Sequence, residues 1–199
     1  MQMKYKLIIS AVSIALFFTA CSNTKVQESL SSIKKEQEIK EEAIKAIQTL
    51  GGTFQKVLNT KVKEGGLTNA ANFCSTNASS LEKEISKTLD KGVKVRRITS
   101  KARNQANSAN SEELIVLEEI KEKLENAQNV DLIIKKKSIN HYKVYKPILI
   151  SAKCLNCHGN DKQRDLESYN IILKKYPNDK AINYKSGDLR GAFLVDIIK

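Results

Sequence analysis

The sequence predicts an α+β domain in which helices pack on an antiparallel sheet, and three observations support this fold class. Apolar residues recur at helical spacing through much of the first half, between residues 43 and 125. Stretches typical of strands follow mainly in the second half, at 130–134, 141–151 and 191–198. Because helices come early and strands late, without a regular alternation of the two, the pattern favours an α+β fold.

The first helices are predicted from two apolar stripes. Gly65-Gly66 ends the first helix, and a second covers about 67–90. Gly51-Gly52 lies inside the first helix at a cost of about 1 kcal/mol per glycine, so it marks a break, a close approach of something bulky, or chance. The first stripe consists of Ala43, Ile47, Leu50, Phe54, Val57 and Leu58, and the second of Ala70, Cys74, Ala78, Leu81 and Ile85.

The middle of the chain alternates between extended and helical patterns. Residues 93–98 (VKVRRI) alternate as a strand does, and 103–111 form a turn-rich loop. Asn110 is placed to cap a following helix, because a short polar side chain can accept a hydrogen bond from the first backbone N–H groups. The apolar face of that helix consists of Leu114, Leu117, Ile120 and Leu124.

The last third contains most of the predicted sheet. Pro147 places the strand at 141–151 at an edge or a bulge, because proline has no N–H for the ladder. A short helix with Leu166, Tyr169, Leu173 and Tyr176 on it is stopped by Pro177, and 191–198 (GAFLVDII) form a buried terminal strand.

The N-terminus has the pattern of an export signal. Leu7 to Ala20 is a run of 14 apolar and small residues after Lys4 and Lys6, suited to a signal peptide and short for a membrane span. Small residues lead into Cys21, which resembles a bacterial lipoprotein signal that lipidates this cysteine. We therefore predict a signal peptide at 1–20, a polar tether at 21–42 and a domain at 43–199, facing the periplasm from a membrane that the sequence does not identify.

The formal net charge of +12 favours acidic partners or anionic lipid head groups. Nucleic acid is excluded as a partner, because it is absent from the predicted compartment. Membrane attachment through Cys21 and an unidentified redox or signalling protein of the envelope are the partners that we expect.

The stretch CLNCHG at 154–159 carries the chemistry. Cys154, Cys157 and His158 form C-x-x-C-H, the attachment signature of haem c, in which two thiols bind the porphyrin covalently and the adjacent imidazole binds iron. A zinc site formed by Cys74, these two cysteines and a histidine is one alternative, and a redox dithiol is another. Zinc gains nothing from a histidine directly beside the second cysteine, and no βαβ unit surrounds the motif, so one haem c is favoured.

The second axial ligand of that haem is left open by the residues alone. Met1 and Met3 are the only methionines and are removed with the signal, which excludes a His/Met cytochrome. Cys74 and His141 are nearly equal candidates, and a lysine or an open site is a further alternative. Small residues around Cys74 would let the helix backbone approach a flat ring.

Haem propionates are anionic, so cations are expected beside them. Arg96, Arg97, Arg103 and Arg190 are four of only five arginines, and at least one of them is expected to pair with a propionate. Among the residues near the predicted loop, we assign Arg97, Arg103 and Asn104 to cofactor binding.

The chain resembles the PAS-like c-type haem sensor domains, a bacterial family long catalogued as a domain of unknown function. The resemblance implies that His158 is one axial ligand and that a cysteine on an earlier helix, Cys74 here, is the sixth ligand. The stretches that carry the resemblance are AANFCSTNA at 70–78, VKVRRITSKARNQANSANSEE at 93–113, YKPILISAKCLNCHG at 145–159 and GDLRGAFLV at 187–195.

Three classes of function follow from these features. A redox or gas sensor that switches iron ligands is favoured by the resemblance. A lipid-anchored electron-transfer cytochrome is the alternative. A haem enzyme such as a peroxidase is the least favoured, because it needs an open iron face that Cys74 ligation would block, so we expect no enzyme.

Overall fold

The computed structural model describes residues 20–199 of the chain. The predicted signal peptide, apart from Ala20, and the side chain of Cys21 lie outside the described residues. The chain divides into two compact units, Met1–Gln37 and Glu38–Lys199. In the described part of the chain, no helix is long and apolar enough to cross a membrane.

The long helix α1 (Ala20–Thr76) extends through the predicted tether and first helix. The second unit begins before Ala43, the predicted domain boundary, because Ile39 is fully buried in the core. Ile39 lies one helical turn before Ala43 and continues the same apolar stripe. The buried positions of this stripe are Ile39, Ala43, Ala46, Ile47 and Leu50.

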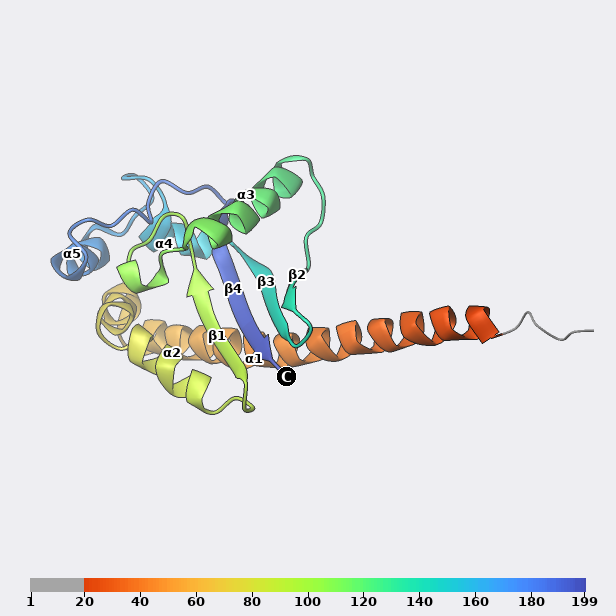
Figure 1. The fold of residues 1–199 in the computed structure, drawn as a ribbon. Coiled ribbons are helices and arrows are strands. Elements are labelled where there is room, and N and C mark those ends of the chain that lie inside the picture. Colours follow the sequence, from red (N-terminus) through yellow and green to blue (C-terminus); the bar gives the residue numbers. More distant parts are fainter. Residues whose placement is uncertain (1–19) are drawn as a thin grey trace, which may run out of the picture. The chain divides into compact units, whose positions relative to one another are not determined.

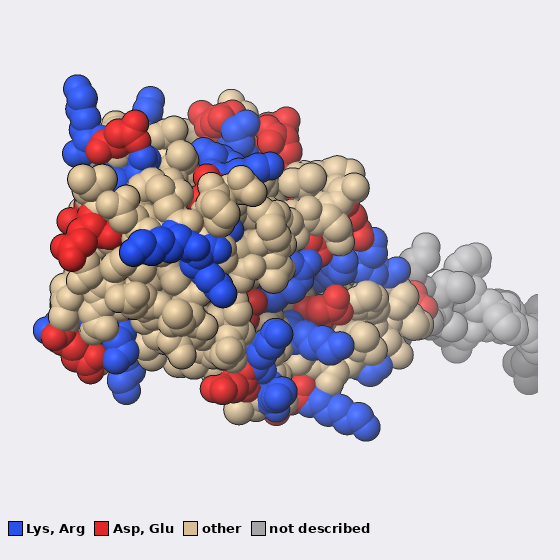
Figure 2. All heavy atoms as spheres, turned by 90° about the vertical axis from the view of Figure 1, so that its left-hand side faces the viewer, with Lys and Arg blue, Asp and Glu red and all other residues tan. Residues whose placement is uncertain are grey.

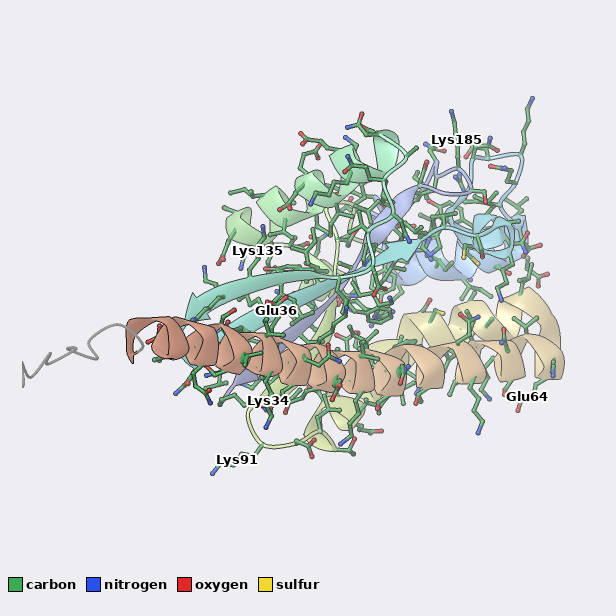
Figure 3. All side chains as sticks on the ribbon, turned by 90° about the vertical axis from the view of Figure 1, so that its right-hand side faces the viewer. Lys34, Glu36, Glu64, Lys91, Lys135 and Lys185 are labelled. Carbon is green, nitrogen blue, oxygen red and sulfur yellow. The ribbon has the colours of Figure 1, made fainter. Side chains whose placement is uncertain are left out.

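The two glycine pairs of α1 have different roles. Gly65 and Gly66 leave helical geometry, with φ of −163° and 70°, so the predicted end of the first helix is confirmed as a sharp turn between two helical parts. The turn comes directly after Glu64, which is labelled in Figure 3. Gly51 stays helical, and a Cβ there would lie 3.0 Å from the Phe193 ring, so the close approach of a bulky group accounts for it.

The predicted helix at 67–90 is divided by Asn77, which corrects that prediction. The first part of it ends α1 at Thr76, and the second forms α2 (Ala78–Lys87). The hydroxyl of Thr76 donates to the Asn72 carbonyl at 2.8 Å and lies 2.6 Å from Asn77 Oδ1. Short polar side chains of this kind compete with the backbone for hydrogen bonds, and they weaken a helix interior.

Four antiparallel strands form one sheet in the order β1-β4-β3-β2 (Figure 1). They are β1 (Val93–Ile98), β2 (Ile133–Ser138), β3 (His141–Leu149) and β4 (Leu189–Ile198). β2 starts three residues after Val130, where the strand was predicted to begin, and extends through lysines that the apolar pattern did not include. The fold class is confirmed, with β4 as a central strand between β1 and β3.

The sheet is covered by helices on both faces. The capping box of Asn110 and Glu113 starts α3 (Ser111–Glu125), which confirms the predicted cap, and α3 packs on one face through Val116, Leu117 and Ile120. On the other face, α1 and α2 pack against a second core cluster. That cluster contains Val93 and Val95 of β1, Tyr142 and Val144 of β3, and Val195 and Ile197 of β4.

Pro147 lies where β3 has a neighbouring strand on one side only. β3 is an interior strand of the sheet, but its pairing with β2 ends at Tyr145, so the strand has a free edge at the proline. A bulge follows between Ile148 and Leu149, which confirms the prediction of an edge or a bulge at Pro147. The proline therefore marks the point at which the sheet gives way to the segment that carries the cysteine motif.

After β3 the chain forms short elements at one end of the sheet. A 3-10 turn (Ala152–Cys154) leads directly into α4 (Leu155–His158), and α5 (Leu166–Lys175) follows after a turn. Asp165 caps α5 by accepting from Ser168 N at 2.9 Å. Residues 176–188 then return past α4 to β4 (Figure 1).

Candidate functional site

The cysteine motif is folded as one tight helical segment. Cys154 ends the 3-10 turn, and Cys157 and His158 lie on α4. Gly159 ends α4, and its N–H donates to the Leu155 carbonyl at 2.9 Å. A Cβ at this position would lie 2.7 Å from that same carbonyl oxygen, so the turn after the histidine needs a glycine.

A returning segment at 181–184 holds this motif in place. Backbone N–H groups of Tyr184 and Asn183 donate to the carbonyls of His158 and Gly159, each at 3.0 Å. The Ala181 carbonyl lies 2.8 Å from Nδ1 of His158. Because a carbonyl can only accept, Nδ1 carries the proton in this contact, and Nε2 keeps its lone pair.

The environment of His158 keeps the imidazole neutral. Burial lowers the pKa of His158 well below its usual 6.5, and the nearby guanidinium groups of Arg103 and Arg190 lower it further. A neutral imidazole with a protonated Nδ1 is the form that binds a metal through Nε2. The short segment thus presents a neutral imidazole whose tautomer is set by the backbone and suits metal binding.

Arg103 connects the motif to the returning segment. Its Nε lies 3.0 Å from Asp179 Oδ2, and its Nη2 donates to the Cys157 carbonyl at 2.8 Å and lies 3.5 Å from His158 Nδ1. The other oxygen of Asp179 accepts from Ala181 N at 2.8 Å. The Asp179 carboxylate is fully buried. This ion pair therefore positions both the residue before the histidine and the carbonyl that orients its ring.

A cavity of about 290 Å³ lies between α1, the sheet end and the motif. Cys74, Cys154 and His158 line it, so the structure brings together one of the two proposed attachment cysteines and two of the proposed iron ligands. Cys157 is half-buried beside them. The apolar lining includes Phe54, Leu58, Ile98, Ile148, Leu149, Ile150 and Phe193.

Cys74 reaches this cavity from the part of α1 that follows the glycine turn. Burial raises the pKa of the Cys74 thiol, and Arg103 and Arg97 act in the opposite direction. Of its small neighbours, Ala78 also lines the cavity, whereas Ala70 and Ala71 are buried without lining it. The small residues near Cys74 therefore fall into two groups, one at the cavity wall and one packed inside the protein.

The arginines assigned to cofactor binding line the cavity but already pair with carboxylates. Arg97 Nε lies 2.8 Å from Glu82 Oε2, and its guanidinium stacks 4.0 Å from the centre of the Phe54 ring. Arg103 pairs with Asp179. Asn104 accepts from Ala106 N and donates to Ser79 Oγ, which joins the loop to α2. All three residues therefore have structural partners as well as a place at the cavity wall.

Alternation along β1 explains why Arg96 and Arg97 differ. Successive side chains of a strand point to opposite faces, so Arg97 faces the cavity side and Arg96 faces α3. Arg96 Nη2 contacts both carboxylate oxygens of Glu113, at 2.6 and 2.7 Å, and Glu113 is buried. Arg96 is thus committed to the fold.

Arg190 also lines the cavity, although the sequence assigned it only as one of four arginine candidates. In the sequence, the neighbouring Gly191 was the residue that could have drawn attention to Arg190. In the structure Gly191 has φ of 154°, and a Cβ there would lie 2.1 Å from the Ile98 carbonyl oxygen. Such a position marks a distortion of the strand, but the direction in which it turns Arg190 depends on the register with β3.

His141 lies at the opposite end of β3 from the motif. It pairs with Ile198 in the sheet, and its Nε2 lies 2.7 Å from Asp196 Oδ1. His141 is not among the residues that line the cavity. Its place in the fold therefore does not support the alternative of His141 as sixth ligand.

The zinc alternative also lacks geometric support. Among residues 20–199, no group of three histidine, cysteine, aspartate or glutamate side chains is arranged to hold a metal ion. The thiols of Cys74, Cys154 and Cys157 are free.

On the outer surface, positive charge does not gather into one patch on the face shown in Figure 2. On the face shown in Figure 2, lysine and arginine side chains are interspersed with acidic ones. Lysines of β2 and β3 pair with acids elsewhere, as Lys135 does with Glu119 at 2.7 Å and Lys146 with Asp131 at 2.7 Å. The net charge therefore does not by itself define a docking surface.

Comparison with known proteins places the chain in a family. The crystal structure of the cyanobacterial heme-protein Tll0287 matches with a TM-score of 0.60 and 24% sequence identity, over 82% of this chain and 96% of that chain. This match shows the same fold. Among curated proteins, no match was found. The family model Tll0287-like matches residues 26–197, which confirms the family resemblance inferred from the sequence. The chain belongs to the Tll0287-like family.

Proposed function

We propose that the chain binds one haem c, which Cys154 and Cys157 would hold through thioether bonds and whose iron His158 Nε2 and the Cys74 thiolate would bind. The observation that carries the proposal is that Cys74 and His158 line one cavity, with the histidine held in the tautomer that binds iron. The cofactor named for the matched solved structure agrees with this proposal. When bound, the haem supplies an iron centre that cycles between ferric and ferrous states.

The residues around the cavity fit such a group. Two cysteines on one short helical segment can reach one porphyrin, and the apolar lining suits its faces. Arg103 and Asp179 hold the backbone that orients His158. Support of this kind fixes a ligand in one orientation, and it commonly decides how strongly a metal is held.

The preferred role is a redox- or gas-responsive sensor in which Cys74 is released from the iron. Burial raises the pKa of the Cys74 thiol, so its thiolate would need a positive charge against it, and a bound haem would supply that charge as iron. A released Cys74 would be held as the protonated thiol by the same burial. Two coordination states of this kind form the bistable element that a signalling partner can read.

The helix that carries Cys74 is well placed to pass on such a change. Three residues after Cys74 the helix breaks at Asn77, and α2 begins. Ser79 of α2 accepts a hydrogen bond from Asn104 at 2.7 Å, which links it to the loop containing Arg103. Movement of Cys74 would therefore reach both α2 and the residue that holds the motif.

An electron-transfer cytochrome is the second proposal, because a partly exposed motif is compatible with electron exchange. Cys154 and Cys157 are both half-buried. A peroxidase-like enzyme is the least favoured role, since no acidic side chain and no second histidine line the cavity within residues 20–199.

We also propose that the protein is anchored to a membrane of the envelope through lipidated Cys21 and faces the periplasm. The export pattern of residues 1–20 supports this location. Mass spectrometry of the mature N-terminus tests it, and an unmodified Cys21 would rule out the anchor.

The ligand assignment is tested by electron paramagnetic resonance on protein produced with a haem c attachment system. The ferric wild-type protein should show a low-spin signal with the narrow g-value spread of thiolate ligation. Cys74→Ala should become high-spin, whereas His141→Ala should keep the wild-type signal. An unchanged signal in Cys74→Ala would refute Cys74 ligation, and absence of covalent haem in the wild type would refute haem attachment.

Carbon monoxide binding separates sensor from carrier. For a ligand-switching sensor, the ferrous protein should bind carbon monoxide readily, and oxidation should restore the thiolate signal. A ferrous protein that stays six-coordinate and excludes carbon monoxide for seconds would favour the electron carrier.

A further inference from the structure

Arg190 is the one arginine of the chain that forms no ion pair with a carboxylate among residues 20–199. The other four each lie within ion-pair distance of a carboxylate: Arg96 with Glu113, Arg97 with Glu82, Arg103 with Asp179 and Arg164 with Asp161. Arg190 has no such carboxylate partner among residues 20–199. The Arg190 side chain is half-buried. Burial lowers the pKa of Arg190 from its usual value, while Tyr184 and Asp179 act in the opposite direction. A partly buried charge outside an ion pair is costly, which favours an anionic ligand beside it.

A β-bulge turns Arg190 towards the cavity. In the register of β3 and β4, Ile148 pairs with Gly191 and Leu149 pairs with Leu189, so Arg190 is the extra residue between them. Simple alternation from Ala192 would point Arg190 at α3, because Ala192 packs in the core cluster on that face. The bulge instead places Arg190 at the wall of the cavity that contains His158. Bulges commonly re-aim a side chain beside a functional site.

The guanidinium is fixed in place through one of its nitrogens. Nη1 donates to Thr99 Oγ1 at 2.8 Å and to the Lys101 carbonyl at 3.3 Å. The Thr99 hydroxyl donates in turn to the Arg190 carbonyl at 2.8 Å. Within residues 20–199, Nε and Nη2 make no hydrogen bond, so the two nitrogens that form the fork for a carboxylate remain available.

The surroundings add positive charge. The Tyr184 ring has Lys101 Nζ at 4.4 Å from its centre and the Arg190 guanidinium at 5.7 Å. Lys101 Nζ donates to the Ile182 carbonyl at 2.7 Å, so its charge also lacks a carboxylate partner here. No acidic side chain lines the cavity within residues 20–199. Two cations share one aromatic ring, and neither forms an ion pair with a carboxylate among residues 20–199, which favours an anionic ligand.

We propose that Arg190 is the anchor for a haem propionate, with Nε and Nη2 donating to its carboxylate. This inference rests on the proposed haem c attachment. It assigns the propionate contact to Arg190 and leaves Arg97 and Arg103 to their carboxylate partners. Since β4 pairs with both β1 and β3, the contact would also tie the porphyrin to the centre of the sheet.

The test uses the covalent holoprotein in four forms: wild type, Arg190→Gln, Arg190→Lys and Lys94→Gln. The Lys94 variant is the matched control, because it removes one positive charge from an exposed position on β1. Resonance Raman spectroscopy reports the propionate bending band, which shifts down when the carboxylate loses a hydrogen-bond donor. A shift is expected in Arg190→Gln, a smaller one in Arg190→Lys, and none in the control.

Redox titration gives a second readout. Removal of a cation beside the haem disfavours the electron-richer ferrous state, so the reduction potential should fall more in Arg190→Gln than in the control. If circular dichroism shows that Arg190→Gln does not fold, the Raman shift in Arg190→Lys tests the propionate contact instead. Lysine keeps the positive charge but loses the paired N–H donors of the guanidinium.

The outcomes separate the two proposals. A wild-type protein without covalent haem overturns the proposed function and this inference with it. A wild-type holoprotein whose propionate band is the same in both Arg190 variants overturns this inference alone and leaves the proposed function standing.

Discussion

The two ends of β3 each hold one of the two histidines of the chain, and their environments differ in kind. His141, at the start of the strand, faces the carboxylate of Asp196. His158, beyond the end of the strand, faces a backbone carbonyl and two guanidinium groups. A carbonyl with cations nearby supports the neutral form of His158. The difference teaches that the fold uses one histidine to join two neighbouring strands through a side-chain contact and holds the other as a neutral imidazole with its Nε2 lone pair available.

The largest expected effect comes from replacing each histidine in turn with alanine. His158→Ala should abolish six-coordinate low-spin haem, because no second histidine lines the cavity among the described residues. His141→Ala should leave the visible absorption spectrum unchanged. Absorption spectra of both variant holoproteins check this comparison. A wild-type spectrum in His158→Ala would contradict the assignment of His158 as an iron ligand.

The next effect concerns the ion pair that supports the ligand end. Asp179→Ala leaves Arg103 buried without its carboxylate, so we expect a loss of about 3 to 5 kcal/mol in the free energy of unfolding. Urea unfolding measures it. The control is Asp90→Ala, because its pair with Lys45 is solvent-exposed and should contribute about 0 to 1 kcal/mol. Equal losses of unfolding free energy in the two variants would show that the Arg103–Asp179 ion pair stabilises the fold no more than a surface ion pair does.

A smaller effect is expected at the glycine that follows the ligand. Gly159→Ala places a Cβ against the Leu155 carbonyl and should cost about 1 to 3 kcal/mol by thermal or urea unfolding. Gly52→Ala is the matched control, because it lies in a helix with no atom within 4 Å of the new Cβ. That variant should be more stable by about 0.5 to 1 kcal/mol. Stabilisation by both alanines would mean that the turn at the motif can relax.

The smallest effect lies between the two ends, at Tyr145. Its side chain is fully buried and its hydroxyl has no hydrogen-bond partner among the described residues, so Tyr145→Phe should change stability by less than about 1 kcal/mol at pH 7.

At high pH the same variant should become the more stable protein. Burial raises the pKa of Tyr145 to about 12, from 10.0. The unfolded chain therefore releases this proton above about pH 10 while the folded chain keeps it, and wild-type stability falls between pH 10 and pH 12. Unfolding of both proteins as a function of pH measures the difference, and parallel curves would contradict the raised pKa.

Much of the fold follows from local pattern. The stripe of Ala43, Ile47 and Leu50, the cap at Asn110 and the alternation of 93–98 each specify an element through short-range physics, and each is found. The break at Asn77 and the late start of β2 were missed, because they depend on competition between local hydrogen bonds and on pairing with β3. Ile39 could have been included, since it repeats the spacing of the stripe.

The site divides in the same way. Adjacent residues such as Cys154, Cys157 and His158 form a motif that a sequence displays directly. The cavity that joins Cys74 to His158, and the carboxylates that occupy Arg97 and Arg103, arise from contacts between distant segments. Arg190 depends on a register shift between strands, which no local pattern encodes.

The central position of β4 has a consequence for the order of events during biogenesis. β4 (Leu189–Ile198) is the last strand to emerge during synthesis, and it alone joins β1 to β3. Until it arrives, the chain can form its helices and the β2–β3 pair but not the complete sheet, and pairing between distant segments is slow. The segment with Cys154 and Cys157 is therefore synthesised ahead of the strand that completes the fold. An attachment enzyme that acts on extended chains would have an interval in which both thiols are open to it.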